Sequence, residues 1–119
     1  MNMKENIGIF IYYEEGLIDL KLLHSLSYGI EEEGIPYIIK KSELHDYRSL
    51  SQLASEESQL DVGIGLDSNG NVCIHHSKLP DHHYLFERNF SGDENGIRVI
   101  GANGARLVKG IPFKAVEIC

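Results

Sequence analysis

LDVGIGLDSNGNVCIHH, residues 60–76, is the stretch that decides the fold class. Residues 60–66 form a β-prone run, which predicts a strand. The pair Asn69-Gly70 follows, and Asn-Gly is the strongest short-range signal for a β-hairpin. Residues 72–76 should therefore return antiparallel to the first run. A sheet that contains this hairpin has at least one antiparallel strand.

The sequence before the hairpin alternates between strand and helix patterns. The predicted order is strand, helix, strand and helix, over residues 7–13, 19–33, 36–40 and 46–57. In the first helix Leu22, Leu26 and Ile30 repeat at helical spacing, with Leu23 beside them, so they predict one buried stripe. Asp19 is a suitable N-cap for this helix.

The sequence after the hairpin predicts a loop, a third helix and a last strand, over residues 78–92, 94–109 and 111–116. Gly110 should close the third helix. Alternating strands and helices favour a mostly parallel sheet with helices on both faces. The expected fold class is therefore α/β. We expect a three-layer α/β/α single domain over residues 1–119, on a five-stranded mixed sheet whose fourth strand is antiparallel.

Composition excludes several classes of protein. The 119 residues suit one domain, and the net charge of −7 comes without any cluster of Lys or Arg. This balance argues against nucleic acid and anionic membranes as partners. No apolar run is long enough for a transmembrane helix, and the start does not resemble a signal peptide. Cys73 and Cys119 are too few for a disulfide framework, so we expect free thiols and a cytoplasmic location.

A search for catalytic motifs finds no enzyme signature. Gly63 and Gly65 follow a strand but lead into a hairpin, so they do not form a phosphate-binding loop. The pairs His75-His76 and His82-His83 suggest metal ligands, but neighbours on a strand point to opposite faces. Cys73 lies in mid-strand, where packing in the core is expected. Solvated or half-buried histidines are the simpler interpretation of both pairs.

The third helix contains residues that need a close neighbour. Gly101 and Gly104 each cost the helix about 1 kcal/mol relative to Ala, and such glycines mark places where another backbone approaches. A helix–sheet contact within the domain and a contact with another subunit both remain open. Asn103 is predicted on the buried side, where it needs hydrogen bonds from the main chain of a neighbouring loop. Arg106 and Lys109 are predicted on the opposite side.

GIEEEGIPY, residues 29–37, places three acids at the end of the first helix. This is the unfavourable end, because helix C-termini carry partial negative charge. Lys40 and Lys41 are nearby cations, but they lie along a separate strand. A hard divalent cation such as Mg²⁺ or Ca²⁺ takes oxygen ligands and would relieve the repulsion. One helix end cannot complete such a coordination shell, so the other ligands would come from water or another chain. A solvated acidic helix end is the alternative.

Three stretches together resemble one family: GIEEEGIPY, DVGIGLD and NGARLVKGIPF. Their order and spacing are similar to those of the small subunit of the reactivating factor for adenosylcobalamin-dependent glycerol and diol dehydratases. The resemblance covers about residues 7–113. It implies the same five-stranded fold, and a non-catalytic subunit of a chaperone-like complex. That complex releases damaged cobalamin from an inactivated dehydratase, and the small subunit exchanges with the dehydratase medium subunit.

The resemblance also implies partners and site residues. The ATPase activity belongs to a large partner subunit, and the dehydratase large subunit is a transient partner. The middle acid, Glu32, is the implied ligand of a Mg²⁺ or Ca²⁺ shared with the large subunit. Glu31, Glu33, Arg106 and Lys109 are the expected partner interface. We expect no ATP hydrolysis and no bound cobalamin in the isolated chain.

The isolated chain is expected to self-associate through its unoccupied partner surface. Its location is expected in the cytoplasm, within or beside a bacterial microcompartment. The client, a glycerol or a propanediol dehydratase, is undecided. Two alternative functions are the dehydratase medium subunit itself and a small metal-binding enzyme built on the histidines and the acid triplet.

Overall fold

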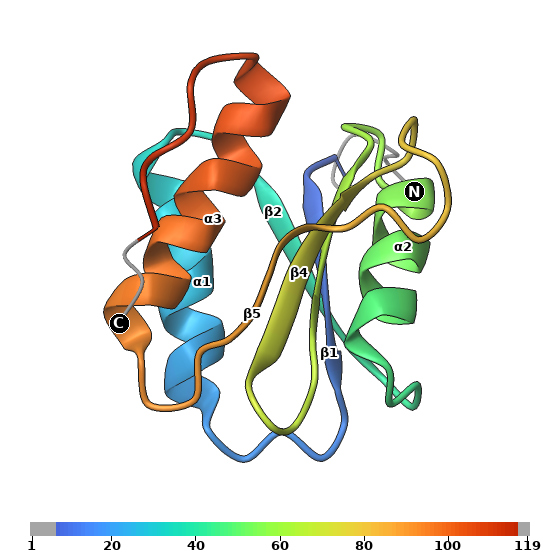
Figure 1. Cartoon of the computed structure of the whole chain (residues 1–119), viewed down its shortest axis with the longest axis vertical. Coiled ribbons are helices and arrows are strands. Elements are labelled where there is room, and N and C mark those ends of the chain that lie inside the picture. Colours follow the sequence, from blue (N-terminus) through green and yellow to red (C-terminus); the bar gives the residue numbers. More distant parts are fainter. Residues whose placement is uncertain (1–6, 117–119) are drawn as a thin grey trace.

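The computed structural model describes residues 7–116, which form a single sheet with three helices (Figure 1). The strands are β1 (Ile9–Glu14), β2 (Tyr37–Ser42), β3 (Val62–Leu66), β4 (Asn71–His76) and β5 (Leu85–Asn89). The helices are α1 (Leu20–Glu32), α2 (Tyr47–Glu57) and α3 (Glu94–Lys109). Aspartates cap all three helix N-termini, and the left-handed Gly110 closes α3 as expected.

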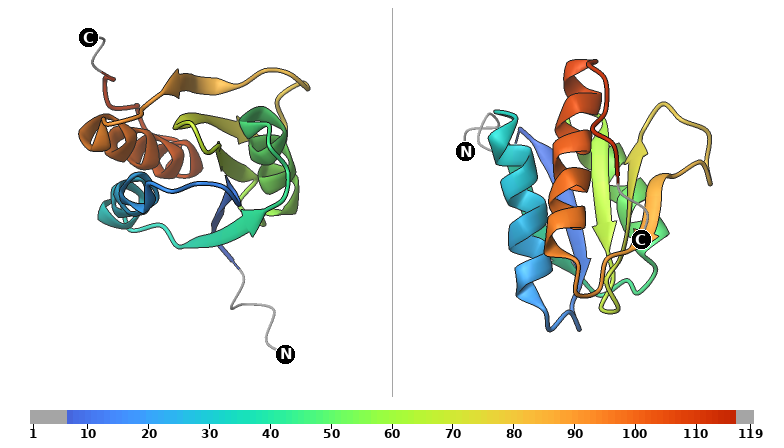
Figure 2. Two further views of the ribbon diagram at one scale, coloured as in Figure 1. Left: turned by 90° about the horizontal axis from the view of Figure 1, so that it is seen from below. Right: turned by 60° about the vertical axis from the view of Figure 1, so that its left-hand side comes forward.

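The sheet order is β2-β1-β3-β4-β5. Strand β1 runs parallel to both β2 and β3, whereas β4 runs antiparallel to β3 and to β5. Helices α1 and α3 pack side by side on one face of the sheet, and α2 covers the other (Figures 1 and 2). The predicted α/β/α architecture is confirmed, including the five-stranded mixed sheet and its antiparallel fourth strand.

One carboxylate stabilises the turn of the hairpin between β3 and β4. Asp67 accepts hydrogen bonds from the main-chain N–H groups of Asn69 (2.8 Å) and Asn71 (2.9 Å). Gly70 has φ 89°, a left-handed conformation that glycine adopts without strain. The Asn-Gly signal therefore predicted the turn correctly, and it fixes the register that pairs Ile64 with Ile74.

The position of the fifth strand was predicted wrongly. Residues 111–116 form no strand, and β5 lies instead within the segment 78–92 that was expected to be a loop. The side chains of Asn103 and Arg106 bind the main chain of residues 112–114, which keeps this segment on α3. We call residues 111–116 the C-terminal strap. Phe113 in the strap contacts Phe86 of β5 edge to face, with ring centroids 5.0 Å apart.

Glycines allow α1 and α3 to pack at backbone contact. A Cβ added to Gly29 of α1 would lie 1.9 Å from the carbonyl oxygen of Arg98, and one added to Gly101 would lie 2.0 Å from that of Leu26. Gly104 instead faces Ile64 of the sheet, at 3.2 Å. The backbone approach predicted for Gly101 is therefore a contact between two helices within the domain, whereas the one predicted for Gly104 is wrong, because side chains lie there. The predicted stripe of α1 is buried beside it.

Candidate functional site

The acidic end of α1 lies against basic side chains of α3. Arg98 Nε donates a hydrogen bond to Glu32 Oε1 at 2.7 Å. Lys109 Nζ donates to Glu33 Oε1 at 2.8 Å and to the main-chain oxygen of Glu33 at 2.9 Å. Arg106 donates to the other Glu33 oxygen at 3.3 Å. Cations from a second helix therefore relieve the repulsion that the sequence showed, and one of them also satisfies a carbonyl at the end of α1.

These contacts keep two of the three acids ionised. A hydrogen bond from Lys109, with a further one from Arg106, lowers the pKa of Glu33. The hydrogen bond from Arg98 lowers the pKa of Glu32. The three acids differ in exposure, because the side chain of Glu33 is 11% exposed while that of Glu32 is 48% exposed and Glu31 lies at the surface. Glu32 and Glu31 are therefore the acids that another molecule can reach.

Arg106 and Lys109 were predicted on the side of α3 opposite its buried arc, but that side is partly covered. Their side chains are 25% and 32% exposed, because α3 contacts the sheet on one side and α1 on another. Arg106 also donates to the carbonyl of Pro112 at 3.0 Å. Three of the four expected interface residues, Glu33, Arg106 and Lys109, thus contact one another, with Glu32 beside Glu33 at the end of α1, whereas Glu31 lies at the surface. We call Glu32, Glu33, Arg98, Arg106 and Lys109 the α1–α3 charge cluster.

The charge cluster does not contain a complete metal site. Within residues 7–116 no three His, Cys, Asp or Glu side chains come together in a way that could hold a metal ion. Glu32 alone could supply one or two carboxylate oxygens, and Mg²⁺ or Ca²⁺ needs six or more ligands. An exposed, ionised carboxylate such as that of Glu32 could serve as one ligand of a cation that another molecule also binds. The remaining ligands would have to come from water or from another molecule.

The histidine pairs are separated by the structure. His75 is buried, with Nδ1 2.7 Å from the Ser55 hydroxyl of α2, whereas His82 and His83 are exposed. Burial lowers the pKa of His75, and its Nε2 has no partner with hydrogen-bond geometry among the described residues. His76 lies beside it on the strand and is half-buried. A metal-binding enzyme built on these residues receives no support from the described part of the chain.

Cys73 is a buried thiol at the contact between α2 and β4. Its Sγ lies 3.1 Å from the Ser51 hydroxyl. Burial raises the pKa of Cys73 to about 12, so the reactive thiolate is not formed near neutral pH. The expected packing role is confirmed. Cys119 lies outside the described residues.

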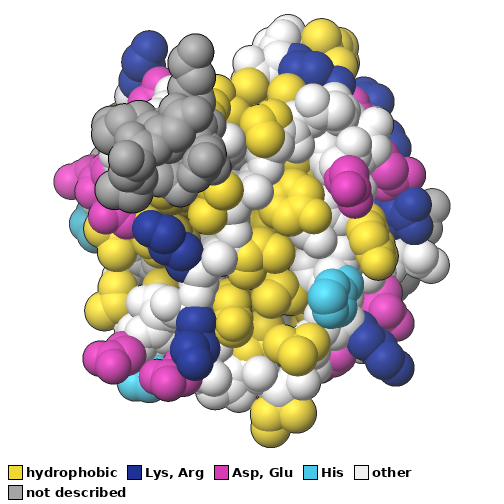
Figure 3. Space-filling model, turned by 180° about the vertical axis from the view of Figure 1, so that it is seen from behind, with side chains coloured by type: hydrophobic (Ala, Val, Ile, Leu, Met, Phe, Trp, Pro, Cys, Tyr) yellow, Lys and Arg dark blue, Asp and Glu magenta, His cyan; other side chains and the backbone are white. Residues whose placement is uncertain are grey.

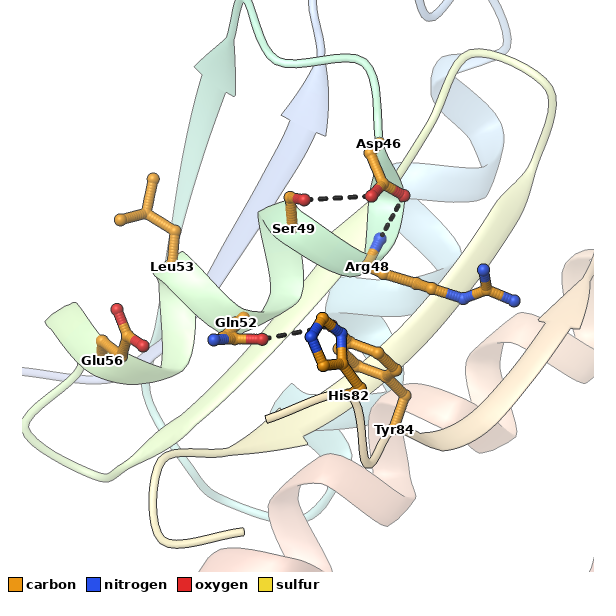
Figure 4. Close-up of a pocket in the computed structure, with 8 residues that line it drawn as sticks. All are labelled: Asp46, Arg48, Ser49, Gln52, Leu53, Glu56, His82 and Tyr84. Carbon is orange, nitrogen blue, oxygen red and sulfur yellow. Dashed lines mark hydrogen bonds between the residues drawn. The ribbon is translucent and has the colours of Figure 1, made fainter. Parts of the chain in front are cut away.

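A hollow of about 420 Å³ lies between α2 and the segment that joins β4 to β5 (Figure 4). Its lining is polar, and several of these groups already bind one another. Asp46 caps α2 through the N–H of Arg48, and Tyr84 donates to Gln52 at 3.1 Å. Arg48 pairs with Glu87, a carboxylate of β5. These pairings occupy several of the polar groups that a small-molecule site in this hollow would use.

Gly63 and Gly65 allow α2 to lie directly on β3. A Cβ at Gly63 would lie 2.2 Å from the main-chain nitrogen of Ser55, and one at Gly65 would lie 2.0 Å from the carbonyl oxygen of Tyr47. The helix backbone therefore occupies the space beside both glycines. These glycines serve packing, as expected for a pair that leads into a hairpin. No helix within residues 7–116 is long and apolar enough to cross a membrane.

Residues 8–114 match the family model described as dehydratase medium subunit. The match spans most of the sheet and helices described above, so the chain belongs to the dehydratase medium subunit family. Within it, the chain groups with small subunits of glycerol and diol dehydratase-reactivating factors, as the following relatives indicate.

Two curated relatives come from Citrobacter freundii. A probable glycerol dehydratase-reactivating factor small subunit is 32% identical, over 92% of this chain and 95% of its own. A propanediol dehydratase-reactivating factor small subunit is 45% identical, over 72% of this chain and 73% of its own. Because the alignment with the first relative extends over nearly all of both chains, the likeness is not confined to the short motifs.

Two solved structures share the fold. A glycerol dehydratase reactivase superposes with a TM-score of 0.88 at 28% identity, and the match covers 93% of this chain and 99% of the other. A diol dehydratase-reactivating factor complexed with ADP and Mg²⁺ gives a TM-score of 0.82 at 35% identity, covering 92% and 98%. The resemblance predicted from three sequence stretches is confirmed, and so is the fold that it implied.

Proposed function

We propose that this chain is the non-catalytic small subunit of a reactivating factor, and that it helps to release damaged cobalamin from an inactivated glycerol or diol dehydratase. It does so by exchanging with the medium subunit of the dehydratase. The observation that carries the proposal is the match of residues 8–114 to the dehydratase medium subunit family, together with its reactivating-factor relatives. Two subunits of one fold can offer a third subunit the same surface, so that one displaces the other.

The ATPase activity is assigned to a larger partner subunit. One structural relative is a reactivating factor complexed with ADP and Mg²⁺. In this chain the glycine-containing strand β3 is packed against the α2 backbone, as the close approach at Gly63 and Gly65 requires. That packing supports nucleotide binding by another subunit, with this chain serving as a binding partner.

Glu32 is proposed as the one ligand that this chain gives to a divalent cation shared with the large subunit. Its exposure and its lowered pKa support this role, because a metal ligand must be reachable and ionised. Lys109 and Arg106 of α3 bind Glu33 at the C-terminal end of α1. We therefore assign to these three residues the role of holding that helix end in position. Glu31 remains at the surface for direct contact with the partner.

The exchange can be tested with purified subunits. An inactivated dehydratase whose medium subunit carries a fluorescent label is mixed with this chain, a reactivating-factor large subunit, ATP and Mg²⁺. We expect labelled medium subunit and free cobalamin to appear together, and neither to appear when this chain is left out. Cobalamin release that is equally fast without this chain would contradict the proposal.

The metal role is tested with Glu32→Gln, which keeps the shape of the side chain and removes its charge. Assembly with the large subunit is measured by sedimentation, with Mg²⁺ alone and with a chelator. We expect Glu32→Gln to weaken the Mg²⁺-dependent part of assembly, and the neighbouring Glu31→Gln to retain it. Equal assembly of Glu32→Gln and the unchanged chain under both conditions would exclude a metal bridge through Glu32.

The second candidate function is the dehydratase medium subunit, which the description of the matching family favours. Affinity purification of this chain from its native host distinguishes the two. Recovery of a large ATPase subunit supports the reactivating factor. Recovery of a stable dehydratase large subunit, without that ATPase, supports the medium subunit.

A further inference from the structure

Strand β2 is an edge of the sheet with main-chain groups directed outward. Among residues 7–116 its one neighbour in the sheet is β1. The carbonyl oxygens of Pro36 and Ser42 accept from Ile9 and Glu15, on the β1 side, at 3.0 and 2.9 Å. In a parallel ladder the alternate residues of a strand bond to the same neighbour. Even-numbered residues of β2 therefore face β1, and the N–H and C=O groups of residues 37, 39 and 41 face away from the sheet.

The helices leave this edge largely uncovered. The main contacts of α2 are with β1, β3 and β4, and α1 meets β2 only slightly. Figure 3 looks onto this side of the molecule and shows hydrophobic side chains in a band down its middle. Ile39 is 38% exposed, and Tyr37 and Ile38 are half-buried. Apolar side chains thus lie beside the outward main-chain groups of an edge strand.

Two lysines follow these apolar residues on β2. Lys40 and Lys41 are exposed, and they point to opposite faces of the sheet because they are neighbours on a strand. Lys40 Nζ lies 5.4 Å from the ring centroid of Phe10 and 5.8 Å from that of Tyr12, which holds the ammonium group close to the strand. Lys41 approaches Glu15 at 3.9 Å, and both of these side chains are more than half exposed.

We propose that the free edge of β2 binds an extended, acidic segment of another polypeptide, which adds to the sheet as a sixth strand. The main-chain groups of residues 37, 39 and 41 would pair with the segment, as in other cases of strand addition. Its apolar side chains would cover Ile38 and Ile39. Its carboxylates would meet Lys40 on one face and Lys41 on the other. The proposal is independent of the reactivating role proposed above.

The same lysines argue against a second copy of this chain on the edge. Two β2 strands paired about a two-fold axis would bring two lysines from each copy into one six-residue ladder. Like charges in neighbouring positions across a ladder are destabilising, and edge lysines are a common protection against self-pairing. A strand that carries Asp or Glu at those positions gains attraction instead. Charge complementarity therefore selects the acidic segment.

The test uses the full chain, labelled with ¹⁵N, and a six-residue peptide with blocked ends that carries Val-Val-Glu-Glu at its centre, so that each face of the added strand presents one Val and one Glu. Hydrogen exchange is followed for each amide of β2. We expect saturating peptide to slow exchange of the outward amides of Ile39 and Lys41 by about tenfold, because exchange then requires the peptide strand to open. The amides of Ile38 and Lys40, which already face β1, should change little. A peptide with Lys in place of Glu should protect none of them.

Two variants sharpen the result. Ile39→Pro removes an outward N–H, at an edge position where proline is tolerated, and should abolish the protection; Ile39→Val should retain it. The double variant Lys40→Glu and Lys41→Glu should reverse the preference, so that the Lys peptide protects and the Glu peptide does not. Equal protection by both peptides, or none by either, would overturn the proposal. Protection that rises with protein concentration without peptide would assign the edge to a second copy.

Discussion

Asn103 and Lys114 bind each other in both directions. The side-chain amide of Asn103 donates to the carbonyl of Lys114 at 3.0 Å, and the Lys114 N–H donates to Asn103 Oδ1 at 2.7 Å. Asn103 thus satisfies the main chain of the strap as a neighbouring strand would. A segment with a β-prone sequence is therefore held on a helix instead of joining the sheet.

Replacing Asn103 by Ala should release the strap. Two hydrogen bonds are lost, which should lower the free energy of unfolding by about 1–2 kcal/mol. Trypsin should then cut after Lys114 faster than in the unchanged chain, as measured by mass spectrometry over time. Asn95→Ala, at an exposed position of α3, is the matched control and should leave the cleavage rate unchanged. Equal rates in both variants would mean that other contacts hold the strap.

The two central glycines of α3 should respond differently to Ala. Gly101→Ala puts a Cβ against the Leu26 carbonyl oxygen, so we expect a loss of about 3 kcal/mol or more as the helices separate. Gly104→Ala meets the flexible end of Ile64, and the better helix propensity of Ala, about 1 kcal/mol, offsets that contact. Thermal unfolding should rank Gly104→Ala close to the unchanged chain and Gly101→Ala far below it. Similar melting temperatures would contradict the backbone contact between α1 and α3.

Stability should fall as the pH drops from 7 towards 5, because His75 is buried in its neutral form. Its folded pKa is lowered, so below about pH 6.5 the unfolded chain takes up a proton that the folded chain does not. The free energy of unfolding then decreases by at most about 1.4 kcal/mol per pH unit for this group. The nearby main chain of Pro80 opposes this lowering of the His75 pKa most, followed by the charges of Glu56 and Asp81, and His76 adds to the lowering.

Urea unfolding at several pH values measures this effect. His75→Asn should be less stable at pH 7 but should show a flatter dependence between pH 7 and 5. His83→Asn, at an exposed position, should keep the slope of the unchanged chain. A slope that His75→Asn leaves intact would assign the proton uptake to another group.

The three acids at the end of α1 should contribute unequally to stability. Glu33→Gln breaks two ion pairs to partly buried cations, Glu32→Gln breaks one exposed pair, and Glu31→Gln breaks none that the described residues make. The loss of stability in urea should therefore rank Glu33 above Glu32 and Glu32 above Glu31. The differences should shrink in high salt, because screening weakens exposed ion pairs. An equal effect of all three variants would indicate that only net charge matters.

Local signals allowed most elements to be predicted from the sequence. The caps of α1 and α3 and the turn after β3 depend on a few adjacent residues, and each was predicted close to its observed place. Asn103 was also predicted correctly to bind main chain, because a buried amide requires partners. Strand β5 has no such signal. Phe86 has φ 54°, and the pairing with β4 shifts register between Val72 and Ile74.

The charge cluster could be predicted only in part. The unfavourable placement of three acids was visible in the sequence, but Glu33 is separated from Arg106 by 73 residues and from Lys109 by 76. No local pattern identifies partners so far apart. The helical projection placed Arg106 opposite the buried arc of α3, because it considered a single buried face of that helix. Helix α3 has a second buried face, against α1. That face could be located only from the packing of Gly29 and Gly101 in the structure.

The contact between α1 and α3 also has a consequence for biosynthesis. Gly29 and Gly101 fit against each other's helices, although most of the chain is translated between them. While the ribosome makes residues 33–93, α1 and the sheet beneath α3 have an uncovered apolar surface, and long-range pairing of this kind is slow to form. The nascent chain is therefore exposed to aggregation until its last helix emerges. Synthesis close to a binding partner would shorten that interval.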